Sequence, residues 1–178
     1  YGPDKVEIEQ ENAQGDQSNL KTIVSRFKAE KPKLICAIAT PAAQAAANEI
    51  KELPIVGTAI TDYTSAKLVQ NDERPGGNVT GVSDFAAMDA QMELAAKLIP
   101  QAKHVGLIYC SSEVNSEVQA NQMKDYCKKH GLSVEERTVN NVNDIQQVAE
   151  SLVGKVDYIY VPTDNTLASS IPTLMKIT

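Results

Sequence analysis

Small polar side chains follow almost every apolar run of this chain. The clearest case is Tyr158-Ile159-Tyr160-Val161, which leads directly into Pro-Thr-Asp-Asn-Thr and then into an Ala/Ser/Leu stretch of helical character. One Asp is enough to cap the helix, so Thr163, Asp164 and Asn165 supply more polar groups than a cap requires. Hydroxyls and free helix N-termini bind carboxylates, and an Asp pairs with an ammonium. Such groups together suit a small zwitterion.

Small polar residues also follow the other predicted strands, and we call the residues just after a strand its tip. Because ligands of open parallel α/β sheets bind beyond the carboxyl ends of the strands, we collect the residues at these tips as candidates. Thr40, Ser112 and Asp164 are also plausible N-caps, and capping remains the alternative for each of them. The candidate ligand-binding residues are Asn12, Thr40, Pro41, Ala42, Thr61, Asp62, Ser83, Asp84, Ser112, Glu113, Asn115, Thr163, Asp164 and Asn165.

Motifs for catalysis and for metal or cofactor binding are missing from the sequence. There is no GxSxG, HExxH, P-loop or helix-opening GxGxxG. Cys36, Cys110 and Cys127 have neither CxxC spacing nor His neighbours, and their odd number argues against a disulfide framework. Glu113 and Asp164 are a possible carboxylate pair, but nothing in the sequence fixes their distance. We therefore expect no enzyme, no metal, no cofactor and no disulfide.

The composition is that of a globular, acidic protein. Of 178 residues, 42% are hydrophobic and 22% are charged, and the net charge is −6. Because this balance leaves no basic patch, we expect no nucleic-acid partner. Its apolar runs are shorter than the roughly 18–20 residues of a membrane span.

Strand-like and helix-like segments alternate along the chain, which predicts an α/β fold with parallel sheets flanked by helices. The run 34–39 (LICAIA) is continuously apolar, as expected of a strand buried on both faces. The alternation of strands and helices restarts after Pro100, so we expect two lobes, 1–101 and 102–178. The predicted strands are 5–9, 34–39, 54–60, 79–83, 104–109, 132–139 and 156–161; the predicted helices are 17–30, 41–53, 88–99, 115–130, 142–153 and 167–177.

Four phrases, in order, resemble the substrate-binding lipoproteins of ABC transporters. These are IATPAAQAAAN (38–48), ERPGGNVTGVSD (73–84), IYCSSEVNS (108–116) and SLVGKVDYIYVPTDNT (151–166). More narrowly, they are similar to the branch associated with uptake of aromatic amino acids, tryptophan and tyrosine in particular. The resemblance implies a two-lobed type I periplasmic-binding-protein fold with a hinge and one solute in the cleft. One departure is Cys110-Ser111, where relatives often have Asn-Pro.

The resemblance also implies partners and a location. We expect an extracytoplasmic protein that serves a membrane permease and touches the membrane only through a lipid anchor outside this chain. Relatives have a further strand and helix before residue 1 and continue past residue 178 with a strand that returns to the first lobe. Both lobes are therefore expected to be incomplete here.

Roles follow for individual residues if the resemblance holds. The N-terminus of helix 41–53 would receive the ligand carboxylate, and Asp164 the ammonium, with Asn165 and Ser112 orienting it. Asp164→Asn should then weaken binding while folding stability barely moves, and Asp62 or Asp84 is the next choice. The aromatic end of the ligand would meet one of three rings: Tyr63, Phe85 or Tyr109.

Two other functions stay open at this point. A ligand-sensing domain of a receptor or regulator would have the same fold, although the acidic charge and missing DNA-binding segment disfavour a repressor. An α/β enzyme fragment is the third possibility. The exact solute does not follow from the sequence, because the shape of a pocket depends on side-chain directions.

Overall fold

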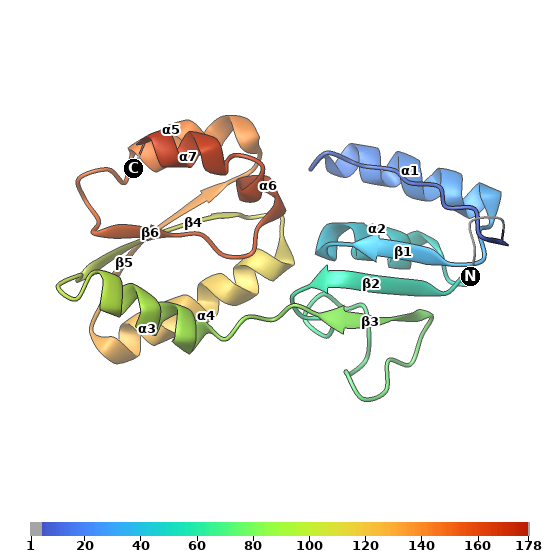
Figure 1. Cartoon of the computed structure of the whole chain (residues 1–178), viewed down its shortest axis with the longest axis horizontal. Helices are drawn as coiled ribbons and strands as arrows, with labels where there is room; N and C mark the ends of the chain where they lie inside the picture. Colours follow the sequence, from blue (N-terminus) through green and yellow to red (C-terminus); the bar gives the residue numbers. More distant parts are fainter. Residues whose placement is uncertain (1–4, 178) are drawn as a thin grey trace.

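Two separate parallel sheets form the framework of the chain, which is described over residues 5–177 by a computed structural model (Figure 1). The first has the order β1-β2-β3 and the second the order β5-β4-β6. All four strand pairs are parallel, which confirms the predicted α/β class. The strands are β1 Ile35–Ile38, β2 Ile55–Ile60, β3 Val79–Ser83, β4 His104–Cys110, β5 Ser133–Val139 and β6 Tyr158–Tyr160.

Helices connect the strands, mostly with the predicted bounds. They are α1 Gln17–Glu30, α2 Thr40–Glu49, α3 Met88–Leu98, α4 Val114–His130, the short 3-10 helix η2 Val142–Asp144, α5 Ile145–Glu150, α6 Asn165–Ala168 and α7 Ile171–Ile177. The helix predicted over 167–177 is in fact two helices. Pro172 lacks a backbone N–H and its ring clashes with the preceding turn, so one continuous helix cannot pass through it. No helix within residues 5–177 is both long and apolar enough to cross a membrane.

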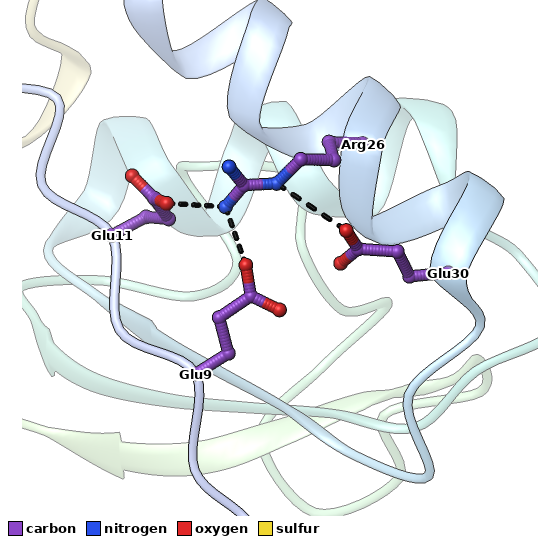
Figure 2. Close-up of polar contacts among 4 residues, drawn as sticks. All are labelled: Glu9, Glu11, Arg26 and Glu30. Carbon is purple, nitrogen blue, oxygen red and sulfur yellow. Dashed lines mark hydrogen bonds and ion pairs between the residues drawn. The ribbon is translucent and has the colours of Figure 1, made fainter.

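The N-terminal segment differs from the prediction. Residues 5–9 were expected to form a strand, but they are not part of either sheet and instead run beside α1 (Figure 1). Figure 2 shows what ties them down: the Arg26 guanidinium of α1 contacts Glu11 and lies 2.7 Å from the Glu9 carboxylate and 3.6 Å from that of Glu30. Ion pairs with α1 thus hold this segment, instead of the hydrogen bonds to a neighbouring strand that the prediction implied.

The second sheet is covered by helices on both faces. Every residue of β4 after His104 is buried. Cores lie on the two sides of this strand: Leu107 and Tyr109 pack with Met123 of α4, whereas Ile108 packs with Leu167 and with helix α5. This is the arrangement expected of a parallel α/β sheet.

The first sheet is covered on one face only. α1 and α2 pack against Ile35, Ile55 and Val79. The residues between them in sequence point the other way and are exposed, among them Ile38, which is 68% exposed. The prediction that 34–39 is buried on both faces is therefore wrong for residues 5–177, where nothing packs on that side.

A close approach between β2 and β3 requires glycine. The Tyr63 hydroxyl donates to the Gly57 carbonyl oxygen at 2.8 Å, and the Val82 carbonyl oxygen lies 3.3 Å away. A Cβ placed on Gly81, whose φ is +157°, would lie 2.0 Å from the Gly57 carbonyl oxygen and 2.1 Å from the Tyr63 hydroxyl. No larger residue fits at position 81 without moving β3.

The chain passes from the first sheet to the second before α3. Met88 and Met92 of α3 belong to the same core as Val105 and Met123 of the second sheet. The sequence predicted a lobe boundary at residues 100–103, because the alternation of strands and helices restarts after Pro100. Since α3 packs with the second sheet, we propose that the boundary lies at residues 84–87 instead.

Candidate functional site

The carboxyl ends of the two sheets face each other. In Figure 1 the arrowheads of β1, β2 and β3 point toward the second sheet, and β6 points toward the first. Within residues 5–177, a hydrogen bond joins the two sides: Gln17 Nε2 of α1 donates to Ser112 Oγ at 3.3 Å. The polar residues that follow the strands of the two sheets therefore lie at sheet edges that face each other, whereas Asn12 follows no strand.

Glu113 is the centre of the polar network on the second lobe. Its Oε1 accepts the Thr166 N–H at 2.9 Å and the Thr166 hydroxyl at 2.8 Å. Its Oε2 accepts the Asn165 N–H at 3.0 Å, Asn165 Nδ2 at 2.7 Å and Asn115 Nδ2 at 3.1 Å. Only 3% of the residue is exposed. Glu113 thus holds the start of α6 against the start of α4.

Asp164 is the N-cap of α6 and also accepts a hydrogen bond from strand β4 of the second sheet. Its Oδ1 accepts the Leu167 N–H at 2.8 Å, and its Oδ2 accepts the Cys110 N–H at 2.7 Å. Asn at this position would supply one acceptor where the structure uses two. An unsatisfied buried N–H costs about 1–3 kcal/mol, so these two hydrogen bonds predict that Asp164→Asn lowers folding stability, in contrast to the expectation from the sequence.

The pKa values of the two buried carboxyls, Glu113 and Asp164, are shifted in opposite directions. Burial acts to raise the pKa of Glu113, but hydrogen bonds from Asn165, Asn115 and Thr166 outweigh it, and its pKa lies below the ordinary value. At Asp164, burial and then the neighbouring charge of Glu113 raise the pKa above its ordinary value. The pKa of Glu113 is lowered because hydrogen bonds stabilise its charged form, whereas the pKa of Asp164 is raised mainly because burial removes water from its charged form.

The rest of this loop is fixed by the first turns of α4. Asn115 Nδ2 and Ser116 Oγ donate to the Thr163 carbonyl oxygen at 2.8 and 3.2 Å. Gln119 Oε1 accepts the Thr163 N–H at 2.8 Å, and Gln119 Nε2 donates to the Thr163 hydroxyl at 3.0 Å. The Asn115 Oδ1 atom is buried and has no hydrogen-bond partner among residues 5–177. Most polar groups of this tip are therefore engaged with one another.

The N-terminus of α2 is open by comparison. Its N-cap is Ala39, which offers no capping side chain and has φ +77° and ψ 152°. The predicted cap, Thr40, lies one residue inside the helix and is 2% exposed. Pro41 has no N–H, and the N–H groups of Thr40 and Ala42 have no hydrogen-bond partner in the described chain. Two backbone donors thus remain free at this strand end.

The other tips of the first lobe differ in how far they are engaged. Asp62 Oδ1 accepts the Ser65 N–H at 2.8 Å, and Ser83 Oγ donates to the Thr61 carbonyl oxygen at 2.8 Å. The buried Thr61 hydroxyl has no partner within residues 5–177. Asp84 is exposed, and its carboxylate makes no hydrogen bond or ion pair in that range. Asn12, also exposed, accepts the Gln14 N–H at 2.8 Å.

Of the three candidate rings, only one is exposed. Tyr63 is buried in the first core. Tyr109 lies in the second core, where its hydroxyl donates to Glu136 at 2.7 Å; burial, then Glu136, raises its pKa to about 12. Phe85 is 45% exposed and lies in the segment that joins the lobes. Tyr63 and Tyr109 are thus used in packing, and Phe85 is the exposed ring of the three.

Neither of two cavities on the surface of residues 5–177 is lined by Asp62, Asp84 or Asp164. The larger, about 430 Å³, lies wholly in the first lobe between α2 and the loop before β3. The other, about 340 Å³, runs between α1 and α2 and reaches the second lobe at Ser112. Gln17 lines it and was missed from the sequence, because one Gln in a helix's first turn has no distinguishing pattern. Residues 5–177 contain no cluster of three His, Cys, Asp or Glu side chains able to hold a metal ion.

Comparison with known proteins identifies the family. A family model described as ABC transporter substrate binding protein matches residues 2–178, almost the whole chain. The chain belongs to this ABC transporter substrate-binding protein family. The resemblance drawn from the four sequence phrases is thereby confirmed, and the family consists of solute-binding proteins rather than enzymes.

Individual relatives of this chain are closely similar. It is 45% identical over 174 residues to a tyrosine-binding protein of Clostridioides difficile, a match over 98% of this chain and 50% of the relative. It is 44% identical, with a TM-score of 0.96, to the crystal structure of an ABC domain from Streptococcus pneumoniae in complex with L-Trp, over 99% of this chain and 60% of the other. The fold is thus the type I periplasmic-binding-protein fold, and the chain spans about half to three fifths of these relatives.

A third relative allows the arrangement of the two lobes to be compared, because its sequence is as similar to this chain but its structure was determined in the open form. The ligand-free, open structure of a substrate-binding protein from Clostridium difficile is 45% identical over 99% of this chain and 60% of its own, yet its TM-score is 0.62. The L-Trp complex, at nearly the same identity and coverage, gives 0.96. The arrangement of the two sheets in this chain thus resembles that of the complex more than that of the open form.

Proposed function

We propose that this chain forms most of the ligand cleft of an extracytoplasmic ABC-importer binding protein, and that its ligand is an aromatic amino acid. The observation that carries the proposal is the pair of facing sheet edges, one of which presents an uncapped helix N-terminus and an unpaired carboxylate. The relatives that bind tyrosine and L-Trp support the choice of an aromatic ligand. A membrane permease is the partner that this role requires.

The N-terminus of α2 is the proposed carboxylate site. The free N–H groups of Thr40 and Ala42, together with the positive end of the helix dipole, attract an anion. The strained backbone at Ala39 supports this assignment, because conformations that disfavour a side chain occur most often at functional sites.

Asp84 replaces Asp164 as the proposed partner of the ammonium. Both oxygens of Asp164 already accept backbone N–H groups, whereas the Asp84 carboxylate has no partner within residues 5–177. β1 and β3 are two strands apart, roughly 10 Å, a distance that an amino acid spans when its two charged groups are each hydrogen bonded at about 3 Å. Phe85, the next residue, would contact the ring of the ligand.

The test is calorimetric titration of the full-length protein with L-Tyr, L-Trp and L-Phe. Asp84→Asn should weaken the binding of the best of these by roughly 2–5 kcal/mol, about 30- to 4,000-fold, because it removes the charge that pairs with the ammonium. Phe85→Ala should weaken aromatic ligands only. Asp62→Asn is the matched control, since it removes a carboxylate one strand away.

Several outcomes would count against the proposal. If none of the three amino acids binds, the ligand class is wrong. If Asp84→Asn binds as tightly as the parent while Asp62→Asn does not, the ammonium site belongs to Asp62. A ligand at 100 times its dissociation constant should add about 2.7 kcal/mol of stability, so a thermal shift provides an independent check.

A further inference from the structure

One side chain from each lobe meets across the interlobe region. Gln17, in the first turn of α1, donates from Nε2 to the Oγ of Ser112, which follows β4, at 3.3 Å. The two residues are 95 positions apart in the chain. They approach each other because the carboxyl ends of the two sheets face each other (Figure 1). The contact therefore depends on how the two lobes are arranged.

Ser112 has neither of the surroundings that its place in the sequence suggested. It was a candidate N-cap, but the N-cap of α4 is Glu113, and no side chain caps that helix. It was also a candidate for orienting the ligand, but its hydroxyl is engaged by Gln17 Nε2 and lies 3.2 Å from Cys110 Sγ. A hydroxyl has one donor and two acceptor positions, so these two contacts use two of the three.

Both partners of the contact are held firmly by their own lobes. On the side of Ser112, the N–H of Cys110 donates to Asp164 Oδ2 at 2.7 Å. On the side of Gln17, Asp16 caps α1 by accepting a backbone N–H of the first turn at 2.7 Å. Each partner thus moves with its lobe. A rotation of the lobes that separates the two atoms beyond about 3.5 Å breaks the hydrogen bond.

The contact belongs to one of the two lobe arrangements seen among the relatives. The lobes are arranged as in the L-Trp complex, with a TM-score of 0.96, and differ from those of the open relative, with a TM-score of 0.62. We call the first of these the closed arrangement. Gln17 and Ser112 both line the cavity of about 340 Å³ between α1 and α2, which therefore includes both lobes only in this arrangement.

We propose that the hydrogen bond between Gln17 and Ser112 is a latch, a contact that stabilises the closed arrangement and slows the release of a ligand that it does not touch. The latch rests on the proposed function, in which the two lobes close on a small ligand. Such a ligand binds in proportion to the population of the closed arrangement. Because both side chains are neutral and exposed, the effect of the latch is a few-fold change.

The test is stopped-flow measurement of ligand release from the full-length protein, with L-Tyr, L-Trp and L-Phe in turn. Gln17→Ala and Ser112→Ala should each speed release by about 2- to 10-fold, the ratio that one net hydrogen bond gives, and leave the association rate unchanged. The factor should be the same for all three ligands, because the latch contacts none of them. A factor that differs among the ligands would place these side chains in the ligand site and overturn the latch.

The double variant distinguishes one shared contact from two independent effects. Removing both side chains should speed release no more than removing either one, and factors that multiply would contradict the latch. Ser111→Ala and Asn19→Ala are the matched controls. Ser111 Oγ donates to Asn140 Oδ1 at 2.9 Å within the second lobe, and Asn19 Nδ2 donates to the Ala13 carbonyl oxygen at 3.4 Å within the first. Both controls should release ligand at the parent rate, and a control as fast as Ser112→Ala would also count against the latch.

A measurement without ligand keeps the latch separate from the choice of ligand. Nitroxide labels on Lys33→Cys and Lys155→Cys, both exposed and in different lobes, report the interlobe distance by pulsed electron resonance in a Cys36→Ser background. Ser112→Ala should lower the closed fraction by the same 2- to 10-fold, roughly the ratio of one hydrogen bond. If none of the three amino acids binds, the proposed function fails, but this ratio still decides on the latch. Equal closed fractions in parent and variant would overturn it.

Discussion

Glu113 shows how a residue that looks like a ligand contact in sequence can be structural instead. Its carboxylate accepts five hydrogen bonds from Asn115, Asn165 and Thr166, which join the starts of two helices. Sequence alone placed Glu113 among the polar tips, but its partners are 52 and 53 residues away for α6. That pairing depends on how β4 and β6 sit side by side, which no local pattern encodes.

Replacing Glu113 by Gln should reduce the free energy of unfolding by about 1–3 kcal/mol at pH 7, since one acceptor oxygen becomes a donor facing other donors. The loss should depend on pH. The folded-state pKa of Glu113 is lowered, so its stabilisation is present above the unfolded value, about 4.3, and is lost as pH falls through the folded value. Urea unfolding at pH 7 and at pH 3 should thus show a difference between parent and variant that shrinks in acid.

Glu117→Gln serves as the control for this experiment. Glu117 is exposed in the first turn of the same helix, and its replacement should change stability by no more than about 0.5 kcal/mol. A Glu113→Gln variant as stable as the parent at pH 7 would contradict the role of Glu113 as a structural acceptor.

At the scale of elements, the junction between β1 and α2 is under backbone strain. Ala39 has φ +77° and ψ 152°, a region that is nearly reserved for glycine. Ala39→Gly should therefore leave stability unchanged or raise it by about 1 kcal/mol, against the usual direction of an Ala-to-Gly change. The measurement is chemical denaturation of the variant, with Ala37→Gly, two residues earlier in β1, expected to lose about 0.5–1 kcal/mol. A destabilised Ala39→Gly would mean that the strain is not there.

The N-terminal segment depends on charge for its position. Arg26→Gln removes the contacts with Glu9, Glu11 and Glu30 that are drawn in Figure 2. These groups are exposed, so we expect little change in the thermal midpoint but faster cleavage within residues 6–12 by a protease specific for Glu. High salt should have a similar effect on the parent because it screens exposed pairs. Lys21→Gln, at an α1 lysine with no ion pair among residues 5–177, should cleave at the parent rate.

The elements themselves were largely predictable from the sequence. Periodicity placed α1 at its observed bounds and β3 at 79–83, and Gly131 ends α4 in the left-handed conformation as expected. Residues 5–9 were mistaken for a strand because an apolar alternation carries no information about whether a neighbouring strand exists. The candidate site was predictable as a set of strand tips, whereas the division into free and engaged tips required tertiary contacts.

At the scale of the whole molecule, α3 determines where one lobe ends. Met92, 2% exposed, packs in the core of the second sheet, although the sequence grouped it with the first. Met92→Ala should cost about 2–5 kcal/mol through the cavity it leaves. Hydrogen exchange should then accelerate in β4 and β5 but not in β1 and β2. Acceleration confined to the first sheet would return α3 to the first lobe.

The close packing at Gly81 has an evolutionary consequence. Any side chain at position 81 meets the Gly57 carbonyl oxygen at 2.0 Å and the Tyr63 hydroxyl at 2.1 Å, so shortening Tyr63 alone cannot make room for it. Position 81 should therefore be closed to single-step substitution in this lineage. Position 57 is different: its Cβ would meet the Tyr63 hydroxyl at 2.7 Å, and all three of its nearest neighbours belong to side chains. We expect sequences that have lost Gly57 to have also replaced Tyr63 by a smaller residue, while Gly81 stays unchanged beside both.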